Sequence, residues 1–141
     1  MSLGLGCGDD ELPGLIPMTQ KSVCIRRWDK EQIVVISERD CVFCRELLVR
    51  MRKEMSVLDQ KKVEVLWIES SPAACLENAQ RFPEFGIAKC ISRRVVADKW
   101  GINSTPIVFW VQDEKRMLKK GLFASQQKLP WISSPSSNRL K

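Results

Sequence analysis

The apolar positions follow two different spacings along the chain, one typical of strands and one typical of helices. Apolar runs rich in β-branched residues are typical of strands buried on both faces, and they occupy residues 33–36, 63–68, where Glu64 is the one polar residue, and 107–111. From Cys44 to Leu58 apolar residues instead recur every three or four positions, which predicts an amphipathic helix. Because a strand, a helix and a second strand joined in this way form a right-handed unit of parallel strands, we expect an α/β fold.

A longer connection, about residues 69–104, separates the second run from the third. A Ser-Pro pair signals the start of a helix, which is expected from about Pro72 to Gln80. A second helix is expected from about Ile91 to Trp100, where a glycine follows. We therefore expect a helical insertion before the third strand, because a crossover alone needs fewer residues.

The two ends of the chain differ from its middle. Glycine and proline recur through residues 1–20, which predicts a flexible, irregular arm. We expect a single domain over residues 21–132, because a chain of 141 residues with 44% hydrophobic content suits one core, and a disordered tail over 133–141. The shorter elements expected in the domain are a strand near 23–25, a hairpin strand over 117–123 and a short helix over 125–132.

Composition excludes several kinds of function. The chain contains no histidine, so histidine-based catalysis and histidine metal ligands are excluded. The net charge of +6 comes from short basic pairs scattered among acidic residues, with no basic block interleaved with aromatic residues. This pattern is typical of a solvated surface, so we expect no nucleic acid partner. No apolar run approaches the roughly 20 residues that a membrane span needs.

Six cysteines in a chain of this size favour an oxidising compartment, and their number is even, as a disulfide framework requires. No signal peptide is recognised at the start, so we expect a mature or trimmed form. The sequence Leu5-Gly6-Cys7 has the small-residue character of a lipoprotein cleavage site. Cys7 therefore has two interpretations: a lipid-anchored residue, or a free or paired cysteine in the arm.

Two of the cysteines, Cys41 and Cys44, form a Cys-x-x-Cys pair soon after the first apolar run. In the first turn of a helix both sulfurs lie on one side and can meet, while only the first projects past the helix end. The helix dipole and the unpaired backbone N–H groups favour the thiolate of Cys41, which is the form that attacks disulfides. Arg39 and Arg45 act in the same direction, and Asp40 opposes them. The same pair is also half of a zinc site, and the bare pattern does not decide between the two.

Cys75 and Cys90 fall in the insertion, Cys75 in its first expected helix and Cys90 at the entrance to its second. We predict a disulfide that pins the two helices together, and two unrelated free thiols are the alternative. In the chain-entropy description, closing a loop of this size stabilises the fold by roughly 3 kcal/mol.

A second motif gives the dithiol its context. Thr105-Pro106 stands at the head of the third strand, where a proline without an N–H is the first strand residue or carries a special peptide bond. A Cys-x-x-Cys pair at a strand-to-helix turn, with Thr-Pro opening a later strand, resembles the thioredoxin fold, in which that proline is cis and lies against the redox pair. Within this superfamily, residues 31–123 look most like the catalytic domain of the periplasmic DsbC/DsbG disulfide isomerases. Those proteins share a helical insertion, which in DsbC holds a second disulfide that Cys75 and Cys90 would reproduce.

The resemblance implies both a fold and a chemistry. The fold is a central mixed sheet of about four to five strands flanked by helices, with the helical insertion before the cis-proline strand. Cys41 would be the nucleophile and Cys44 the resolving thiol of a protein disulfide oxidoreductase or isomerase that acts through a mixed disulfide. The residues expected to receive the substrate chain are Thr105, Pro106, Val42 and Phe43. The chemistry requires no cofactor and no metal.

By the same resemblance, the partners would be substrate proteins with cysteines and a soluble or membrane-bound thiol redox partner, in the periplasm or another extracytoplasmic compartment of a bacterium. Thioredoxins proper carry a buried acid six residues before the first cysteine, where this chain has Val35, which favours an oxidising or isomerising relative. The 40 residues before Cys41 are too few for the N-terminal dimerisation domain of the isomerases, so we expect a monomer.

Two other functions stay open. A structural zinc module would use Cys41, Cys44, Cys75 and Cys90, although zinc sites usually draw their ligands from two closely spaced pairs. A non-catalytic, thioredoxin-like binding module would keep the fold without the chemistry.

Overall fold

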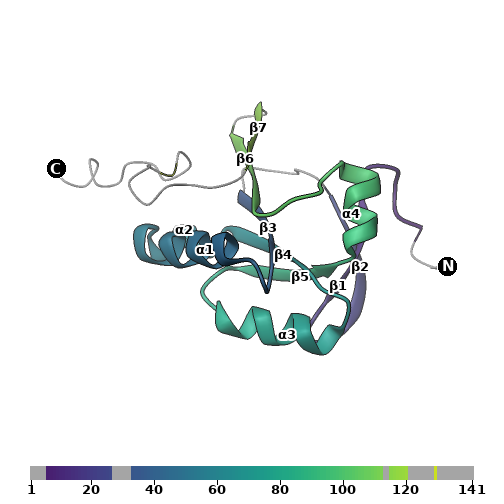
Figure 1. The fold of residues 1–141 in the computed structure, drawn as a ribbon, viewed down its shortest axis with the longest axis horizontal. Helices are drawn as coiled ribbons and strands as arrows, with labels where there is room; N and C mark the ends of the chain where they lie inside the picture. Colours follow the sequence, from purple (N-terminus) through teal and green to yellow (C-terminus); the bar gives the residue numbers. More distant parts are fainter. Residues whose placement is uncertain (1–5, 27–32, 113–114, 121–128, 130–141) are drawn as a thin grey trace.

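A computed structural model gives the structure of residues 6–26, 33–112, 115–120 and 129. The strands are β1 (Leu12–Ile16), β2 (Lys21–Ile25), β3 (Ile33–Glu38), β4 (Val63–Ile68), β5 (Ile87–Ile91), β6 (Ile107–Gln112) and β7 (Lys115–Lys120). The helices are α1 (Val42–Glu54), α2 (Val57–Gln60), α3 (Pro72–Arg81) and α4 (Arg93–Trp100). These strands form one sheet of seven, in the order β2-β1-β5-β4-β3-β6-β7 (Figure 1).

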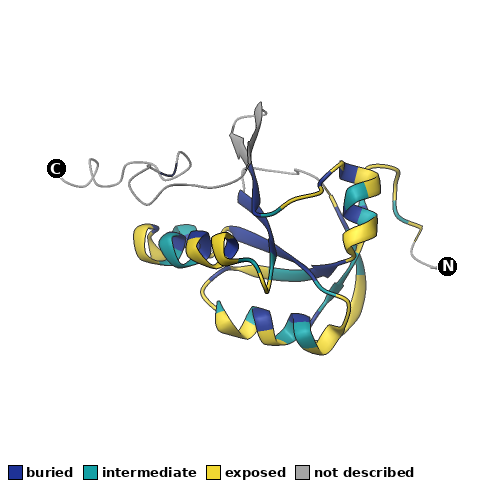
Figure 2. Ribbon diagram, viewed as in Figure 1, coloured by how far each residue is buried: buried dark blue, intermediate teal, exposed yellow. Residues whose placement is uncertain are grey.

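The centre of the sheet is the strand–helix–strand unit that the sequence predicted. β3 and β4 are parallel and are joined through α1 and α2, and β5 lies parallel to β4 on its other side. β6 runs antiparallel to β3, which makes the sheet mixed. Every residue of β4 is buried, and β3 is buried up to Ser37 (Figure 2). Continuous apolar runs are suited to these positions because both faces of the sheet are covered.

Helices cover the two faces of the sheet. On one face, Leu48 of α1 and Cys75 of α3 belong to a buried apolar cluster that includes Val35 of β3. On the opposite face, Val96 and Trp100 of α4 belong to a second cluster. The end of β3, the start of α1 and the start of β6 therefore meet at one edge of a well-supported sheet.

The sheet has seven strands rather than the four to five that the sequence predicted, and the additional strands are β1 and β5. β1 forms within residues 1–20, where we expected an irregular arm, and it pairs with both β2 and β5. Gly14 permits this close approach. A Cβ atom there would lie 2.5 Å from Cδ1 of Ile25 and 3.0 Å from the carbonyl oxygen of Cys90.

The segment before β1 is fixed by the end of α4. Lys99 Nζ donates hydrogen bonds to the carbonyl oxygens of Gly8 and Glu11, at 3.2 and 3.0 Å. Trp100 Nε1 donates one to the carbonyl oxygen of Asp10 at 3.0 Å. These contacts satisfy backbone acceptors that strand pairing leaves unused, which is why a segment rich in glycine takes a defined path here.

The insertion at residues 69–104 is not wholly helical, as we had expected. It contains α3, β5 and α4, because residues 87–91 add to the sheet beside β4. The second helix begins at Arg93 rather than near Ile91, since Ser92 is its N-cap and its Oγ accepts a hydrogen bond from the backbone N of Val95.

The helix expected over residues 44–58 is divided into α1 and α2. α1 ends at Glu54, and Ser56 caps α2 by accepting a hydrogen bond from the backbone N of Asp59 at 3.1 Å. Apart from Leu129, the helix expected over 125–132 and the tail expected over 133–141 lie outside the described residues. In the part of the chain that the structure describes, no helix has the length and apolar character needed to cross a membrane.

Candidate active site

Cys41 and Cys44 lie where β3 leads into α1, and a disulfide joins them. Cys41 is the N-cap of α1, and its Sγ accepts a hydrogen bond from the backbone N of Cys44 at 3.1 Å. Cys41 is partly exposed, whereas Cys44 is fully buried. Of the two sulfurs, the one of Cys41 is therefore the accessible target for an incoming thiolate.

The start of α1 is suited to hold an anion. Its first turn contains no acidic residue, and the positive end of the helix dipole lies there. After reduction, the backbone N–H of Cys44 would donate a charge-assisted hydrogen bond to a Cys41 thiolate. Arg39, which we expected to add to this effect, instead lies 4.0 Å from Glu69 and 3.5 Å from Glu77 in ion pairs. The backbone N–H of Cys44, rather than the side chain of Arg39, is thus in place to support a thiolate.

Thr105 and Pro106 reach this site from a distant part of the chain. Their peptide bond is cis, and Pro106 is buried. The carbonyl oxygen of Thr105 lies 3.8 Å from Sγ of Cys41. This is a close approach rather than a hydrogen bond, because a sulfur in a disulfide carries no hydrogen. The pairing of Ile107 in β6 with Ile36 in β3 brings the start of β6 beside the start of α1.

Two apolar side chains stand at the surface of the site. Val42 and Phe43 separate the cysteines and are 55% and 49% exposed. Exposed apolar side chains beside an accessible sulfur offer surface that a docking protein can cover. The predicted substrate-binding residues therefore come from two places, the first turn of α1 and the turn before β6.

Sequence reasoning missed a carboxylate at this turn. Glu38 is the last residue of β3, and its Oε2 accepts a hydrogen bond from Oγ1 of Thr105 at 2.9 Å. Its Oε1 accepts one from Nη2 of Arg93, at the start of α4. Glu38 raises the pKa of Arg93 above its ordinary value, first through this hydrogen bond and second through charge attraction. No local pattern points to the pair, because 55 positions separate its members.

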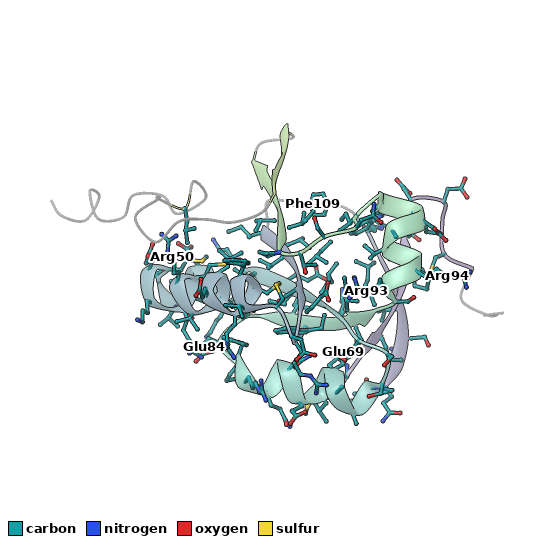
Figure 3. All side chains as sticks on the ribbon, viewed as in Figure 1. Arg50, Glu69, Glu84, Arg93, Arg94 and Phe109 are labelled. Atoms are coloured by element: carbon teal, nitrogen blue, oxygen red, sulfur yellow. A yellow bond between two sulfur atoms is a disulfide. The ribbon has the colours of Figure 1, made fainter. Side chains whose placement is uncertain are left out.

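A cleft of about 560 Å³ opens on the same edge of the sheet. Its walls come from the ends of β3 and β4 and from the start of α4, and they carry charges of both signs. Figure 3 labels Arg93, Arg94 and Glu69, which line it. Nδ2 of the buried Asn78 donates to Glu69 at 2.7 Å, so the acidic wall is held in place. Asp40, directly before Cys41, also lines the cleft, so the cleft lies next to the dithiol.

Two further disulfides lie away from this pair. The predicted pairing of Cys75 with Cys90 is present, but it links α3 to β5 rather than two helices, since Cys90 belongs to β5. Cys7 is joined to Cys24 of β2, so of its two interpretations the structure has the paired cysteine, and a sulfur in that bond does not carry a lipid. Each cysteine is bonded to its neighbour in the cysteine order, and none is free.

The four cysteines of the zinc alternative are not gathered within ligand distance of one another in the described structure. The group of side chains there that does have such spacing is Cys7, Glu11 and Cys24. Its two sulfurs are bonded to each other, so in this state neither is a thiolate ligand.

No protein-family model and no curated protein sequence matches the chain, but solved structures do. A thiol:disulfide interchange protein from Bacteroides sp. matches with a TM-score of 0.58 at 17% sequence identity, over 81% of this chain and 78% of its own. A thio-disulfide isomerase from Thermus thermophilus matches with a TM-score of 0.58 at 20% identity, over 82% and 85%. The thioredoxin domain of a thiol-disulfide oxidoreductase from Bacteroides vulgatus matches with a TM-score of 0.55 at 15% identity, over 80% and 84%.

These likenesses concern the fold. The chain has a thioredoxin-like α/β fold, which confirms the fold class that the sequence predicted. The narrower resemblance to the DsbC/DsbG isomerases stays a prediction, because sequence identities of 15% to 20% do not separate the branches of a common fold.

Proposed function

We propose that the protein is a thiol-disulfide oxidoreductase that exchanges disulfides with other proteins through Cys41 and Cys44. The observation that carries the proposal is the asymmetry of the pair, because Cys41 is partly exposed at the N-cap of α1 and Cys44 is buried. An exposed sulfur can be attacked by a substrate, while a buried neighbour can leave and return without competing for that substrate. The carbonyl of Thr105 beside Cys41 adds a backbone acceptor for an extended substrate chain.

In the oxidising direction, a substrate thiolate attacks Sγ of Cys41. A mixed disulfide forms as the Cys41–Cys44 bond breaks, and Cys44 leaves as a thiolate. A second substrate thiolate then attacks the substrate's own sulfur in the mixed disulfide, which creates the substrate disulfide and releases Cys41 as a thiolate. Two electrons pass from the substrate to the protein, and a thiol redox partner must remove them.

In the isomerising direction, the Cys41 thiolate of the reduced protein attacks a substrate disulfide, and another substrate thiolate releases it, so no net electrons are transferred. We favour these two directions over reduction because Val35 occupies the position where thioredoxins proper carry an acid. Val35 is fully buried in the apolar cluster beneath α1, and its side chain has no group that could relay a proton.

The setting follows from the same reasoning. We propose protein substrates with cysteines, a soluble or membrane-bound thiol protein as redox partner, and a monomer working in an extracytoplasmic, oxidising compartment. The pairing of all six cysteines supports such a compartment. The exposed Val42 and Phe43 support a protein substrate, because a small disulfide would leave most of that apolar surface uncovered.

Two assays test the activity: reduction of insulin by dithiothreitol, and recovery of active ribonuclease A from its reduced or scrambled forms. We expect the wild-type protein to accelerate at least one of them, and Cys41→Ser to reduce both to the uncatalysed rate. The double variant Cys7→Ser/Cys24→Ser is the matched control, because it removes a different disulfide and should keep activity. A wild-type protein inactive in both assays, with an intact Cys41–Cys44 disulfide by mass spectrometry, would instead support the non-catalytic binding module.

A further inference from the structure

The turn before β6 lacks the backbone support that the strands beside it have. Within the described residues, positions 103–105 make no backbone–backbone hydrogen bond. Pro106 has no N–H to contribute, and regular pairing with β3 begins only at Ile107. Something other than the sheet ladder must therefore fix the carbonyl of Thr105 relative to Cys41.

The side chain of Glu38 is placed to do this. Glu38 ends β3, so the sheet fixes its backbone, and its side chain is 21% exposed. One carboxylate oxygen accepts the hydrogen bond from Oγ1 of Thr105 at 2.9 Å, and the other accepts from Arg93. With both oxygens engaged by groups from different elements, the carboxylate is held in one orientation.

We propose that Glu38 is a positioning residue for substrate polypeptides: it holds Thr105 so that the carbonyl of that residue faces the chain entering beside Cys41. The inference rests on the proposed function and extends it, because it separates the requirements of two classes of disulfide. A protein disulfide brings backbone on both sides of its cysteine and uses the positioned carbonyl. A small aromatic disulfide brings no backbone, so it needs only the sulfur of Cys41.

The effect of Glu38 is on geometry rather than on charge, and two variants separate these causes. Glu38→Gln removes the negative charge but keeps a side-chain oxygen that can accept from Thr105. Glu38→Ala removes both. A positioning role predicts that Glu38→Gln retains most of the affinity for a protein substrate and that Glu38→Ala does not. A charge effect on the Cys41 thiolate would make the two variants alike.

The experiment compares insulin with 5,5′-dithiobis(2-nitrobenzoic acid) as disulfide substrates of the reduced protein. For Glu38→Ala we expect KM for insulin to rise about tenfold, because substrate binding must then also order the backbone of Thr105, with kcat nearly unchanged. The rate constant with the small disulfide should stay within about twofold of wild type. Thr105→Val should reproduce this pattern, and Thr105→Ser, which keeps a hydroxyl, should not.

A double-mutant cycle tests whether the two residues act through one bond. We expect Glu38→Ala/Thr105→Val to be no worse than either single variant, because both remove the same interaction. Glu54→Ala is the matched control. It deletes a glutamate that pairs with Arg50 on α1, and it should behave as wild type with both substrates.

Equal losses with insulin and with the small disulfide, or strictly additive effects in the cycle, would overturn the positioning role. Circular dichroism shows whether Glu38→Ala is folded. If it is not, Thr105→Val decides, because valine has almost the same volume as threonine. The failure of this inference is distinct from the failure of the proposed function. An inactive wild-type protein refutes the function, whereas an active wild type with an unaltered Glu38→Ala refutes only the role of Glu38.

Discussion

The carbonyl oxygen of Thr105 lies 3.8 Å from Sγ of Cys41, although 64 positions separate the two residues. The sheet explains this approach. α1 begins just after the end of β3, and β6 runs antiparallel to β3, so β6 must begin beside that same end. Strand pairing thereby brings a backbone acceptor close to the accessible sulfur. Two of the four predictions below concern this site, and two concern the packing of the fold.

The first concerns the resolving cysteine. Cys44→Ser leaves Cys41 able to attack a substrate disulfide but removes the buried thiol that would release the product. We expect a mixed disulfide with insulin chains to accumulate in nearly stoichiometric amounts, visible as a mass increase that dithiothreitol reverses. Cys41→Ser/Cys44→Ser should trap nothing. Trapping by Cys41→Ser alone would reverse the assigned roles.

The second concerns the apolar surface of the site. Phe43 is 49% exposed, so covering its free surface against a substrate is worth about 1 kcal/mol, which corresponds to roughly a fivefold rise in KM for insulin on Phe43→Ser. The midpoint of urea unfolding should hardly change, because the side chain is at the surface. Leu58→Ser is the control, since Leu58 is 72% exposed on α2, beyond the far end of α1. A KM that rises equally in both variants would argue against a docking role for Phe43.

The third concerns the disulfide between α3 and β5. Cys75→Ala/Cys90→Ala opens a loop with a sequence separation of 15, and the chain-entropy description predicts a loss of about 3 kcal/mol in the free energy of unfolding. Both cysteines are buried, so lost packing adds to this figure. Urea denaturation measures the difference, with a separate slope fitted for each protein because opening the bridge expands the unfolded chain. A variant as stable as wild type would mean that the bridge constrains a loop that is already ordered in the unfolded chain.

The fourth concerns a glycine at the turn between α3 and β5. A Cβ at position 86 would lie 1.8 Å from the carbonyl oxygen of Lys61, a backbone atom that cannot move aside. Gly86→Ala should therefore lower the free energy of unfolding by about 3 kcal/mol. Gly101→Ala separates crowding from backbone conformation, since Gly101 has φ +68° but open space around it, and should cost about 1 kcal/mol. Equal costs at the two positions would contradict the close contact.

The central strands could be predicted because their signal is local. Residues 33–36 are apolar without interruption and residues 63–68 are apolar except at Glu64, and such runs are typical of strands covered on both faces. β1 could not be predicted, because Leu12–Ile16 contains a proline and a glycine that usually interrupt strands. Its partners β2 and β5 override that preference, and they are distant in the sequence. β5 could not be predicted either, because it contains the charged Lys89. The residue that pairs with this charge, Glu64, lies in β4 and is distant in the sequence.

The candidate site likewise has a part that the sequence predicts and a part that it does not. The dithiol and the Thr-Pro turn are visible as short motifs, because each is made of residues adjacent in the chain. The hydrogen bond between Thr105 and Glu38 joins residues 67 positions apart, and the sequence around each residue does not indicate the other as its partner. Arg39 was expected to favour the Cys41 thiolate through its charge, but its side chain pairs with Glu69 and Glu77, which only the fold brings near.

The order of the disulfides has a consequence for biosynthesis. Six cysteines can be joined in many ways, and here the first is joined to the second, the third to the fourth and the fifth to the sixth. An oxidant that couples thiols as they emerge from a ribosome or a translocation channel would close each bridge before the following pair arrives. The native set would then be reached in a single pass, without any later reshuffling of bonds.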